Sequence, residues 1–261
     1  LGVLLCMQGN LASGKVLFER ALVISEQVLG SDHPGVAKVL NSLANVACKQ
    51  EEFEQAEQLY QRALQIIEHS LGRDHPDVAQ ELSNLATLAS DQEKYEQAAP
   101  LFERAISILE KALGPEHPKL AFPLGGLGEL LVRQGSYEQA APLCQRALTI
   151  WQQTLGPEHP MVGCVLYILG SIHRGQGDYE QAALFYQRAL HPLEQSGHLE
   201  LGNVLYEFAL LQETQGKVQD AAHLYARSFQ VREQTLGSEH PKTYEARERL
   251  AAVSLSADQG R

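Results

Sequence analysis

The feature that constrains the fold most is a hexapeptide, Leu-Gly-x-x-His-Pro, that recurs along the chain. Its copies begin at Leu29, Leu71, Leu113, Leu155 and Leu236. The first four lie 42 residues apart and the last lies 81 residues further on, which is one step of 42 and one of 39. The weak Ser196-Gly197-His198 marks the masked copy. A fixed period of this length predicts stacked structural repeats instead of one or two ordinary globular domains.

Two further markers recur in the same phase. Arg-Ala-Leu/Ile begins at Arg20, Arg62, Arg104, Arg146 and Arg188, and Arg227 continues the series. An aromatic residue followed by Glu-Gln-Ala occurs at Phe53, Tyr95, Tyr137 and Tyr179. We therefore predict a single solenoid over residues 1–261, with about six repeats near 1–30, 31–72, 73–114, 115–156, 157–197 and 198–237 and a polar capping helix at 238–256. The repeated arginines favour ion pairs between repeats over a ladder of ligand contacts.

Each repeat reads as two helices, which predicts an all-α fold. Apolar residues at helical spacing form the stripe Val36, Leu40, Leu43, Ala44 and Ala47 in a first helix, and Ala56, Tyr60, Ala63 and Ile67 in a second. Small residues at the Ala56 position allow close helix approach, and large ones at the Tyr60 position fill the space between repeats. Cys144 occupies the Tyr60 position, and Trp151 the Ile67 position, so both are predicted to lie in the core.

The segments that connect the helices contain residues typical of helix caps and turns. Ser136-Tyr-Glu-Gln and Asp178-Tyr-Glu-Gln are predicted capping boxes at the start of second helices. The glycine of Leu-Gly is predicted to end the second helix in the left-handed cap conformation. The proline of His-Pro then opens the next first helix, where its missing N–H costs nothing. Half of the ten histidines lie in these linkers, which indicates a structural use.

Composition excludes several functions. The formal net charge is −11, whereas a nucleic-acid binder needs a basic face, and an anionic membrane surface is disfavoured for the same reason. No stretch reaches the roughly 18–20 apolar residues that span a bilayer, and because no basic segment precedes an apolar one we expect no signal peptide. The four cysteines form no CxxC pair, which favours a reduced, cytoplasmic setting. No catalytic motif, metal-ligand spacing or phosphate loop occurs, so we expect neither an enzyme nor a cofactor or metal.

The repeat resembles the tetratricopeptide repeat in the 42-residue form found in kinesin light chains. The matching segments are Leu40-Asn-Ser-Leu-Ala44, Phe53-Glu-Gln-Ala56, Arg62-Ala-Leu64 and the Leu-Gly-x-x-His-Pro linker. The resemblance covers essentially the whole chain. It implies a right-handed α-solenoid whose first helices line a concave groove that holds a peptide or partner helix.

With that geometry, the residues opposite the apolar stripe of each first helix face the groove. The predicted peptide-binding residues are Lys38, Asn41, Asn45, Gln80, Ser83, Asn84, Thr87, Phe122, Gly125, Gly126, Glu129, Arg133, Tyr167, Ile168, Ser171, Arg174, Asn203 and Tyr206. Asn41, Asn45 and Asn84 are amides able to bond a peptide backbone, or else ordinary polar surface. Phe122, Gly125, Gly126, Tyr167 and Ile168 form either an exposed apolar partner site with side-chain-free notches, or tighter packing between repeats.

Three functions follow from these patterns. The leading hypothesis is a protein–protein interaction scaffold that binds a peptide or partner segment in the concave groove. The alternative is a regulatory or sensor array of a larger signalling protein, such as an NTPase, whose catalytic domain lies outside this chain. Because the chain opens on Leu1 in mid-pattern, we expect it to be a fragment of a longer protein. Self-association is a third hypothesis, and the oligomeric state stays open.

Overall fold

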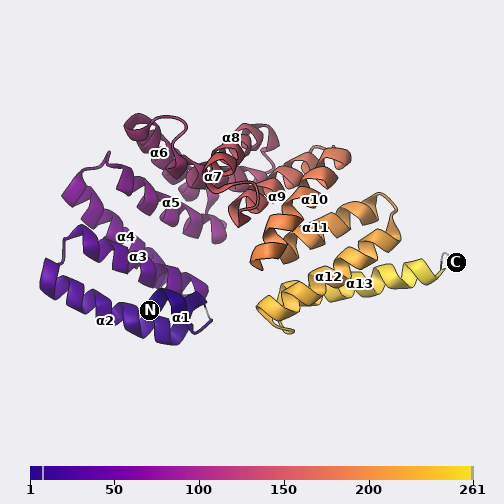
Figure 1. Cartoon of the computed structure of the whole chain (residues 1–261), viewed down its shortest axis with the longest axis horizontal. Helices are drawn as coiled ribbons and strands as arrows, with labels where there is room; N and C mark the ends of the chain where they lie inside the picture. The colour runs from indigo at the N-terminus through magenta and orange to yellow at the C-terminus, as the bar shows by residue number, and fades with distance from the viewer. Residues whose placement is uncertain (8, 260–261) are drawn as a thin grey trace. The chain divides into compact units, whose positions relative to one another are not determined.

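The computed structural model describes residues 1–7 and 9–259, and this part of the chain is all α-helical apart from turns and one short 3₁₀ helix, without a strand (Figure 1). The helices are α1 (Gly2–Met7), α2 (Leu11–Leu29), α3 (Pro34–Lys49), α4 (Phe53–Leu71), α5 (Pro76–Asp91), α6 (Tyr95–Leu113), η1 (Pro118–Leu120), α7 (Ala121–Arg133), α8 (Tyr137–Leu155), α9 (Pro160–Gly175), α10 (Tyr179–Ser196), α11 (Leu201–Thr214), α12 (Val218–Leu236) and α13 (Pro241–Gln259). First and second helices alternate along the chain, which confirms the predicted fold class of helix–turn–helix repeats.

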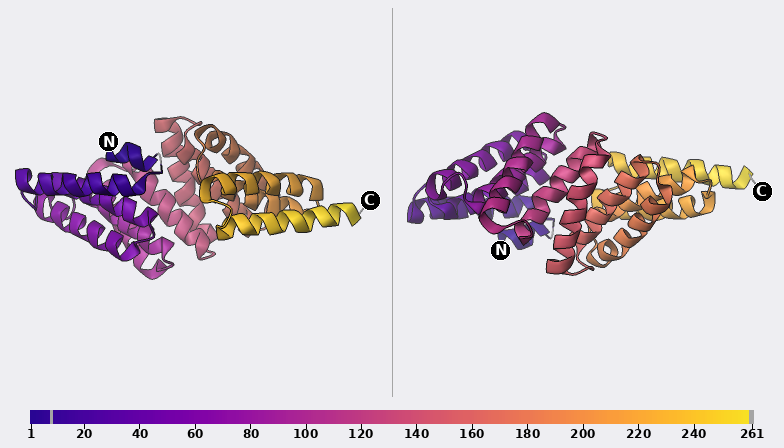
Figure 2. Two further views of the ribbon diagram at one scale, coloured as in Figure 1. Left: turned by 90° about the horizontal axis from the view of Figure 1, so that it is seen from below. Right: turned by 90° about the horizontal axis from the view of Figure 1, so that it is seen from above.

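The chain divides into two compact bodies, an N-terminal body of residues 1–130 and a C-terminal body of residues 131–261. In the N-terminal body, α3 packs against α4, α4 against α5, and α5 against α6. In the C-terminal body, the same order holds for α9 with α10, α11 with α12, and α12 with α13, as Figures 1 and 2 show. The single solenoid over the whole chain stays a prediction.

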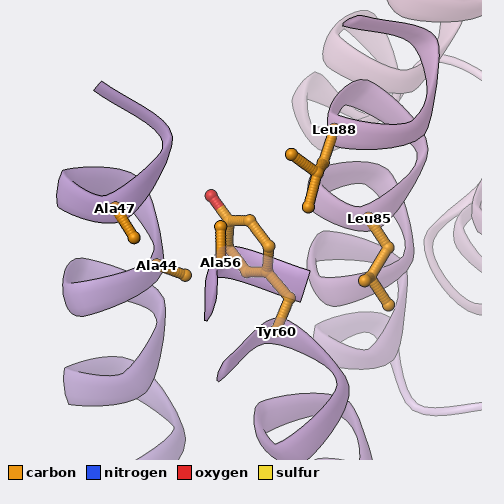
Figure 3. Close-up of a cluster of buried hydrophobic side chains, with 6 residues drawn as sticks. All are labelled: Ala44, Ala47, Ala56, Tyr60, Leu85 and Leu88. Carbon is orange, nitrogen blue, oxygen red and sulfur yellow. The ribbon is translucent and has the colours of Figure 1, made fainter. Parts of the chain in front are cut away.

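The core of the N-terminal body is built on the alternation of small and large residues. Figure 3 shows the Tyr60 ring of α4 between Ala44 and Ala47 of α3 on one side and Leu85 and Leu88 of α5 on the other. All of these side chains are buried. Since alanine lets the α3 backbone come close, one aromatic ring can fill the space between two first helices. The predicted burial of Cys144 and Trp151 is confirmed as well.

A histidine side chain accepts a backbone N–H at the start of the first helix, or in the turn that leads into it, in each repeat from α3 onward. In five linkers and in the weak copy, the His Nδ1 atom accepts a hydrogen bond from the backbone N–H two residues on, at 3.0–3.2 Å. The six capping residues are His33, His75, His117, His159, His198 and His240. An Nδ1 that accepts carries no proton, so each cap needs the Nε2–H tautomer of neutral histidine. The predicted structural use of these histidines is confirmed.

The Leu-Gly joints differ from the predicted left-handed cap. Gly30, Gly72, Gly114, Gly156 and Gly237 have φ of 86–90° and ψ of 154–163°. The left-handed helical region has ψ near +47°, whereas this extended region with positive φ is open essentially to glycine alone. Only Gly197, in the shortened repeat, has the predicted conformation, with φ 61° and ψ 31°. The prediction was wrong because the chain leaves each helix in an extended direction to reach the His-Pro cap.

The turn residue inside the repeats varies along the chain. It has positive φ in every repeat, and it is Gly135, Gly177 and Gly216 in the C-terminal body. In the N-terminal body the same position holds Gly9 in the first repeat, but Glu51 and Glu93, both with φ of 61°, in the next two. The N-cap residue of the second helix, which follows this turn, varies as well. Asp178 accepts from the Gln181 N–H at 3.2 Å, but Ser136 makes no side-chain cap bond. The predicted Ser136 capping box is therefore wrong.

The repeated arginines of the second helices form ion pairs with the preceding repeat. Arg62 pairs with Glu26 at 2.5 Å and Arg104 with Glu68 at 2.6 Å, and Arg227 pairs with Glu194. Arg188 departs from the series and lies over the Phe185 ring. The ion-pair prediction is confirmed for Arg62, Arg104 and Arg227. These side chains are about 40% exposed, so each pair contributes roughly 0–1 kcal/mol.

Candidate functional site

The predicted groove residues fall into three groups by exposure. The exposed ones are Lys38, Asn45, Gln80, Phe122, Glu129 and Arg133. The half-buried ones are Asn41, Asn84, Thr87, Gly126, Tyr167, Ser171, Arg174 and Asn203. Four are buried, namely Ser83, Gly125, Ile168 and Tyr206. A partner that lies on the first helices therefore meets the first two groups.

The expected apolar patch is mostly interior. Phe122 is 38% exposed, but Ile168 is only 7% exposed and Gly125 is buried. A Cβ on Gly126 would lie 2.6 Å from two ring atoms of Phe102, so this glycine makes room for a core ring. The expectation of exposed apolar surface with open notches is wrong for Gly125 and Ile168, which are buried, and for Gly126, because the Phe102 ring of the preceding repeat fills the space beside it.

Ser83 and Tyr206 are buried for separate reasons. The Ser83 hydroxyl donates to the Ala79 carbonyl at 2.6 Å, which is bonding within its own helix. The Tyr206 ring packs edge-on against Tyr225 at 5.4 Å between ring centroids. Neither side chain is open to a partner in this structure.

A cavity on the first-helix face of the N-terminal body brings polar and apolar groups together. It has a volume of about 160 Å³ and is lined by Val3 and Cys6 of α1, Phe18 of α2, and Ser42, Asn45, Val46 and Lys49 of α3. The Asn45 side chain is held by the Tyr60 hydroxyl, which donates to its Oδ1 at 2.6 Å. Fixed in this way, the amide keeps its N–H donors for a further acceptor, and Lys49 lines the same cavity as the apolar Phe18 and Val46.

Farther along the same face, three predicted residues gather around a small depression. Gln80 and Ser83 of α5 and Phe122 of α7 line it together with Lys119. The Gln80 amide donates to Asn84 Oδ1 at 3.1 Å, and Lys119 pairs with Asp77 at 2.9 Å. The Lys119 hydrogen bond to Asp77 lowers the pKa of that carboxyl below its ordinary value. These contacts order the polar surface of α5.

The same helix, α5, contains a buried carboxyl, Glu81. It is 4% exposed, and Asn41 Nδ2 donates to its Oε1 at 2.6 Å. Burial raises the pKa of Glu81 to about 7, against the hydrogen bond from Asn41 that lowers it. Sequence reasoning missed Glu81, although a signal existed. The equivalent positions of the other repeats hold Val39, Pro123, Val165 and Val204, so Glu81 is a charged residue in an apolar register.

In the C-terminal body, a carboxyl that burial also affects, Glu207, forms an ion pair with an arginine. Arg174 of α9 pairs with Glu207 of α11 at 3.0 Å. Burial raises the pKa of Glu207, and the positive charges of Arg174 and Arg232 oppose that shift. Beside this pair, the Tyr167 and Tyr186 rings lie 6.1 Å apart, and the hydroxyls of Ser171 and Tyr186 lie 3.3 Å apart. The predicted residues Tyr167, Ser171 and Arg174 thus belong to one polar-aromatic network.

Arg232 was also missed by sequence reasoning. It is 4% exposed and occupies the register of Ile67, Leu109, Trp151 and Leu193. Its guanidinium donates to the Lys242 carbonyl at 2.7 Å and to Asn203 Oδ1 at 3.2 Å, and it lies 4.4 Å from the Tyr206 ring centroid. Asn203 and Tyr206, both predicted groove residues, therefore bind Arg232 inside the body.

In the described part of the chain, the requirements of a metal site and of a membrane span are not met. Within residues 1–7 and 9–259, no group of three or more His, Cys, Asp or Glu side chains could hold a metal ion. Among the described helices, none combines the length and apolar character that crossing a membrane requires. What the geometry presents is a set of exposed amide, ammonium and apolar groups on rigid helices.

Repeated helical pairs that share a capping histidine, a glycine joint and an alternating small–large core define a tetratricopeptide-type repeat protein. Family models described as tetratricopeptide repeat match residues 1–35, 35–111, 77–143, 119–191 and 201–242. The chain belongs to the tetratricopeptide repeat family. The comparison with curated protein sequences gives no match.

Solved structures with the same fold include bacterial and fungal proteins. BtubC (BKLC) from P. vanneervenii is 23% identical, with a TM-score of 0.68 over 90% of this chain and 93% of that one. A putative kinesin light chain of Podosopora anserina with nearly identical TPR-like repeats is 20% identical, with a TM-score of 0.57 over 75% and 92%. A Rap protein complexed with competence and sporulation factor is 16% identical, with a TM-score of 0.64 over 94% and 75%.

Proposed function

We propose that this chain is a protein-interaction scaffold and that its first-helix face binds a peptide or a segment of a partner protein. Membership of the tetratricopeptide repeat family supports an interaction role, and the Rap structure holds a factor on the same kind of fold. The observation that carries the proposal for this chain is the cavity of about 160 Å³ beside Asn45 and Lys49. We propose no catalytic activity, no nucleic-acid or membrane ligand, and a cytoplasmic location.

Asn45 is suited to hold an extended backbone. Its amide is oriented by the Tyr60 hydroxyl at 2.6 Å, and it is exposed at the mouth of an apolar cavity. A peptide carbonyl can accept from the amide while an apolar side chain enters the cavity over Phe18 and Val46. Asn84, one repeat further on, is held in the same way by Gln80.

The experiment is a peptide selection against the whole chain, followed by affinity measurements on variants. We expect the Asn45→Ala/Asn84→Ala variant to bind the selected peptides at least about tenfold more weakly, which corresponds to about 1.4 kcal/mol. Gln65→Ala, at an exposed position on α4, is the matched control and should leave the affinity unchanged. Selected peptides that bind the double variant as tightly as the wild type would contradict the proposal for this face.

A further inference from the structure

A second cavity lies on the other side of the N-terminal body, between two second helices. We name it the α4–α6 cleft and define it by the floor residues Leu64, Leu85, Leu88 and Leu101 and by Glu57 and Lys94 on its walls. Its volume is about 360 Å³, within the range of roughly 300–1,000 Å³ that is usual for binding pockets. Leu64 and Leu101 are only half-buried although they pack against the core around Tyr60. The cleft therefore exposes an apolar floor to solvent.

The preceding repeat shows how such a cleft is closed. Lys15 of α2 pairs with Glu52 at 2.6 Å and donates to Gln55 at 3.2 Å, which ties α2 to the start of α4. Counting 42 residues on, Lys15 corresponds to Glu57, Glu52 to Lys94, and Gln55 to Gln97. The α4–α6 cleft thus has the same three positions with the two charges exchanged. Among the described residues, no ion pair joins Glu57 to Lys94, and Glu57 instead accepts from Gln61 at 2.9 Å.

The rim of the cleft is acidic. An adjoining cavity of about 530 Å³ shares Gln92 and Lys94 with it and is bordered by Glu51, Glu52, Phe53 and Glu54. Four carboxylates, including Glu57, border the two cavities. Since Lys15 neutralises Glu52, Glu51, Glu54 and Glu57 remain against one ammonium, Lys94. A second copy of this chain is a poor occupant, because a chain of net charge −11 would bring more acid to an acidic rim.

We propose that the α4–α6 cleft is a docking site for a basic amphipathic helix of a partner protein. Leucine-like side chains of the partner enter the cleft over Leu64 and Leu101, and its Lys or Arg side chains face Glu54 and Glu57. Apolar anchors in a pocket with complementary charges at the rim are the recurrent anatomy of helix-in-groove recognition. This surface is separate from the first-helix face, so the scaffold would hold two partners by different chemistry.

The test uses an 18-residue fluorescent peptide with leucine at helical spacing and lysine on the opposite face, titrated with the whole chain in fluorescence anisotropy. We expect saturable binding, and at least tenfold weaker binding of a peptide in which every lysine is glutamate. The decisive variant is Glu57→Lys/Lys94→Glu, which keeps the net charge and reproduces the Lys15–Glu52 tie of the preceding repeat. It should fold with an unchanged or higher melting temperature and bind the lysine peptide at least tenfold more weakly.

The matched control is Glu180→Lys/Lys217→Glu, an exchange of the same charges at exposed positions of the C-terminal body. It should bind the lysine peptide as the wild type does. The proposal is overturned by a wild type that does not bind the lysine peptide, by a folded Glu57→Lys/Lys94→Glu variant that retains full affinity, or by a control that weakens as much. Light scattering that shows a wild-type dimer abolished by Glu57→Lys/Lys94→Glu would overturn it in favour of a second copy.

Discussion

The two bodies bury a carboxylate on the first-helix face in different ways. In the N-terminal body, Glu81 accepts a hydrogen bond from the neutral Asn41 amide, no ion pair joins it to a cation among the described residues, and burial raises its pKa to about 7. In the C-terminal body, Glu207 lies 3.0 Å from Arg174, with the charge of Arg232 also acting on it. The comparison teaches that one repeat architecture can hold a desolvated acid as a hydrogen-bonded group or as half of an ion pair, according to whether the preceding repeat supplies an amide or an arginine.

The largest effect is expected from Arg232, the cation that organises the C-terminal body. Arg232→Ala should lower the free energy of unfolding by about 3 kcal/mol, because it leaves the Lys242 carbonyl and Asn203 without their donor and opens a cavity below Tyr206. Urea denaturation followed by circular dichroism measures the change. Arg188→Ala, at an exposed position of α10, should stay within about 0.5 kcal/mol of the wild type. Equal losses in the two variants would contradict the central role of Arg232.

Neutralising Glu81 should stabilise the protein more than neutralising Glu207. The Glu81 carboxyl loses its proton near its ordinary pKa of 4.5 when unfolded and near 7 when folded, so wild-type stability falls as the pH rises through this window. Glu81→Gln should therefore stabilise the protein by about 2–3 kcal/mol at pH 8.5 and by little at pH 4. Burial also raises the pKa of Glu207, but Arg174 and Arg232 oppose that shift, so Glu207→Gln should stabilise the protein less than Glu81→Gln does at pH 8.5. Thermal unfolding at both pH values checks the pair, and a gain for Glu207→Gln as large as the gain for Glu81→Gln at pH 8.5 would remove the distinction between the bodies.

Substitutions of the turn residue with positive φ inside each repeat should change the free energy of unfolding by less. Glu51→Gly and Glu93→Gly should each stabilise the N-terminal body by about 0.5–1 kcal/mol, since a side chain in the left-handed region is strained. The reverse change in the C-terminal body, Gly177→Glu, should cost about the same. Urea midpoints of the three variants measure this, and a loss of stability in both glycine variants would show that the glutamate side chains contribute contacts that outweigh the strain.

The smallest effect concerns a feature that the two bodies share. His75→Ala and His159→Ala should each cost about 0.5–1 kcal/mol, because each removes the acceptor of a helix N-cap. Asn at either position should restore most of the loss, since its side-chain oxygen can accept the same bond. Melting temperatures of the four variants measure the effect, and Asn variants no more stable than the Ala variants would argue against a capping role.

Much of the fold was predictable because the repeat shows every structural position several times. The period, the helix pairs, the ion pairs of Arg62 and Arg104 and the burial of Cys144 all follow from comparing one repeat with the next. The ψ angle at Gly72 and the bond from His75 Nδ1 to the Asp77 N–H were not predictable, because they depend on the direction in which the chain leaves one helix and enters the next.

The candidate site was less predictable. Helical periodicity places Ile168 and Tyr206 away from the apolar stripe, yet both are buried, and Tyr206 packs against Tyr225 of the following helix. A repeat position has neighbours in two repeats, and the periodicity of one helix carries no information about the second contact. Glu81 and Arg232 could have been found, since each is a charged residue in a register that is otherwise apolar. A charged residue at a repeat position that is otherwise apolar is therefore as informative about the core as the apolar pattern itself.

The glycine joints have a consequence for how such a chain can change length. Gly30, Gly72, Gly114 and Gly156 have nearly the same backbone angles and stand at the same distance from one another. Unequal recombination between any two of them would remove or duplicate one whole module and rejoin the chain at a joint of familiar geometry. Gly197 has different angles and closes a module three residues shorter, so exchanges across it would create a junction of new geometry. Growth and loss of modules in this lineage should accordingly concentrate before Gly197.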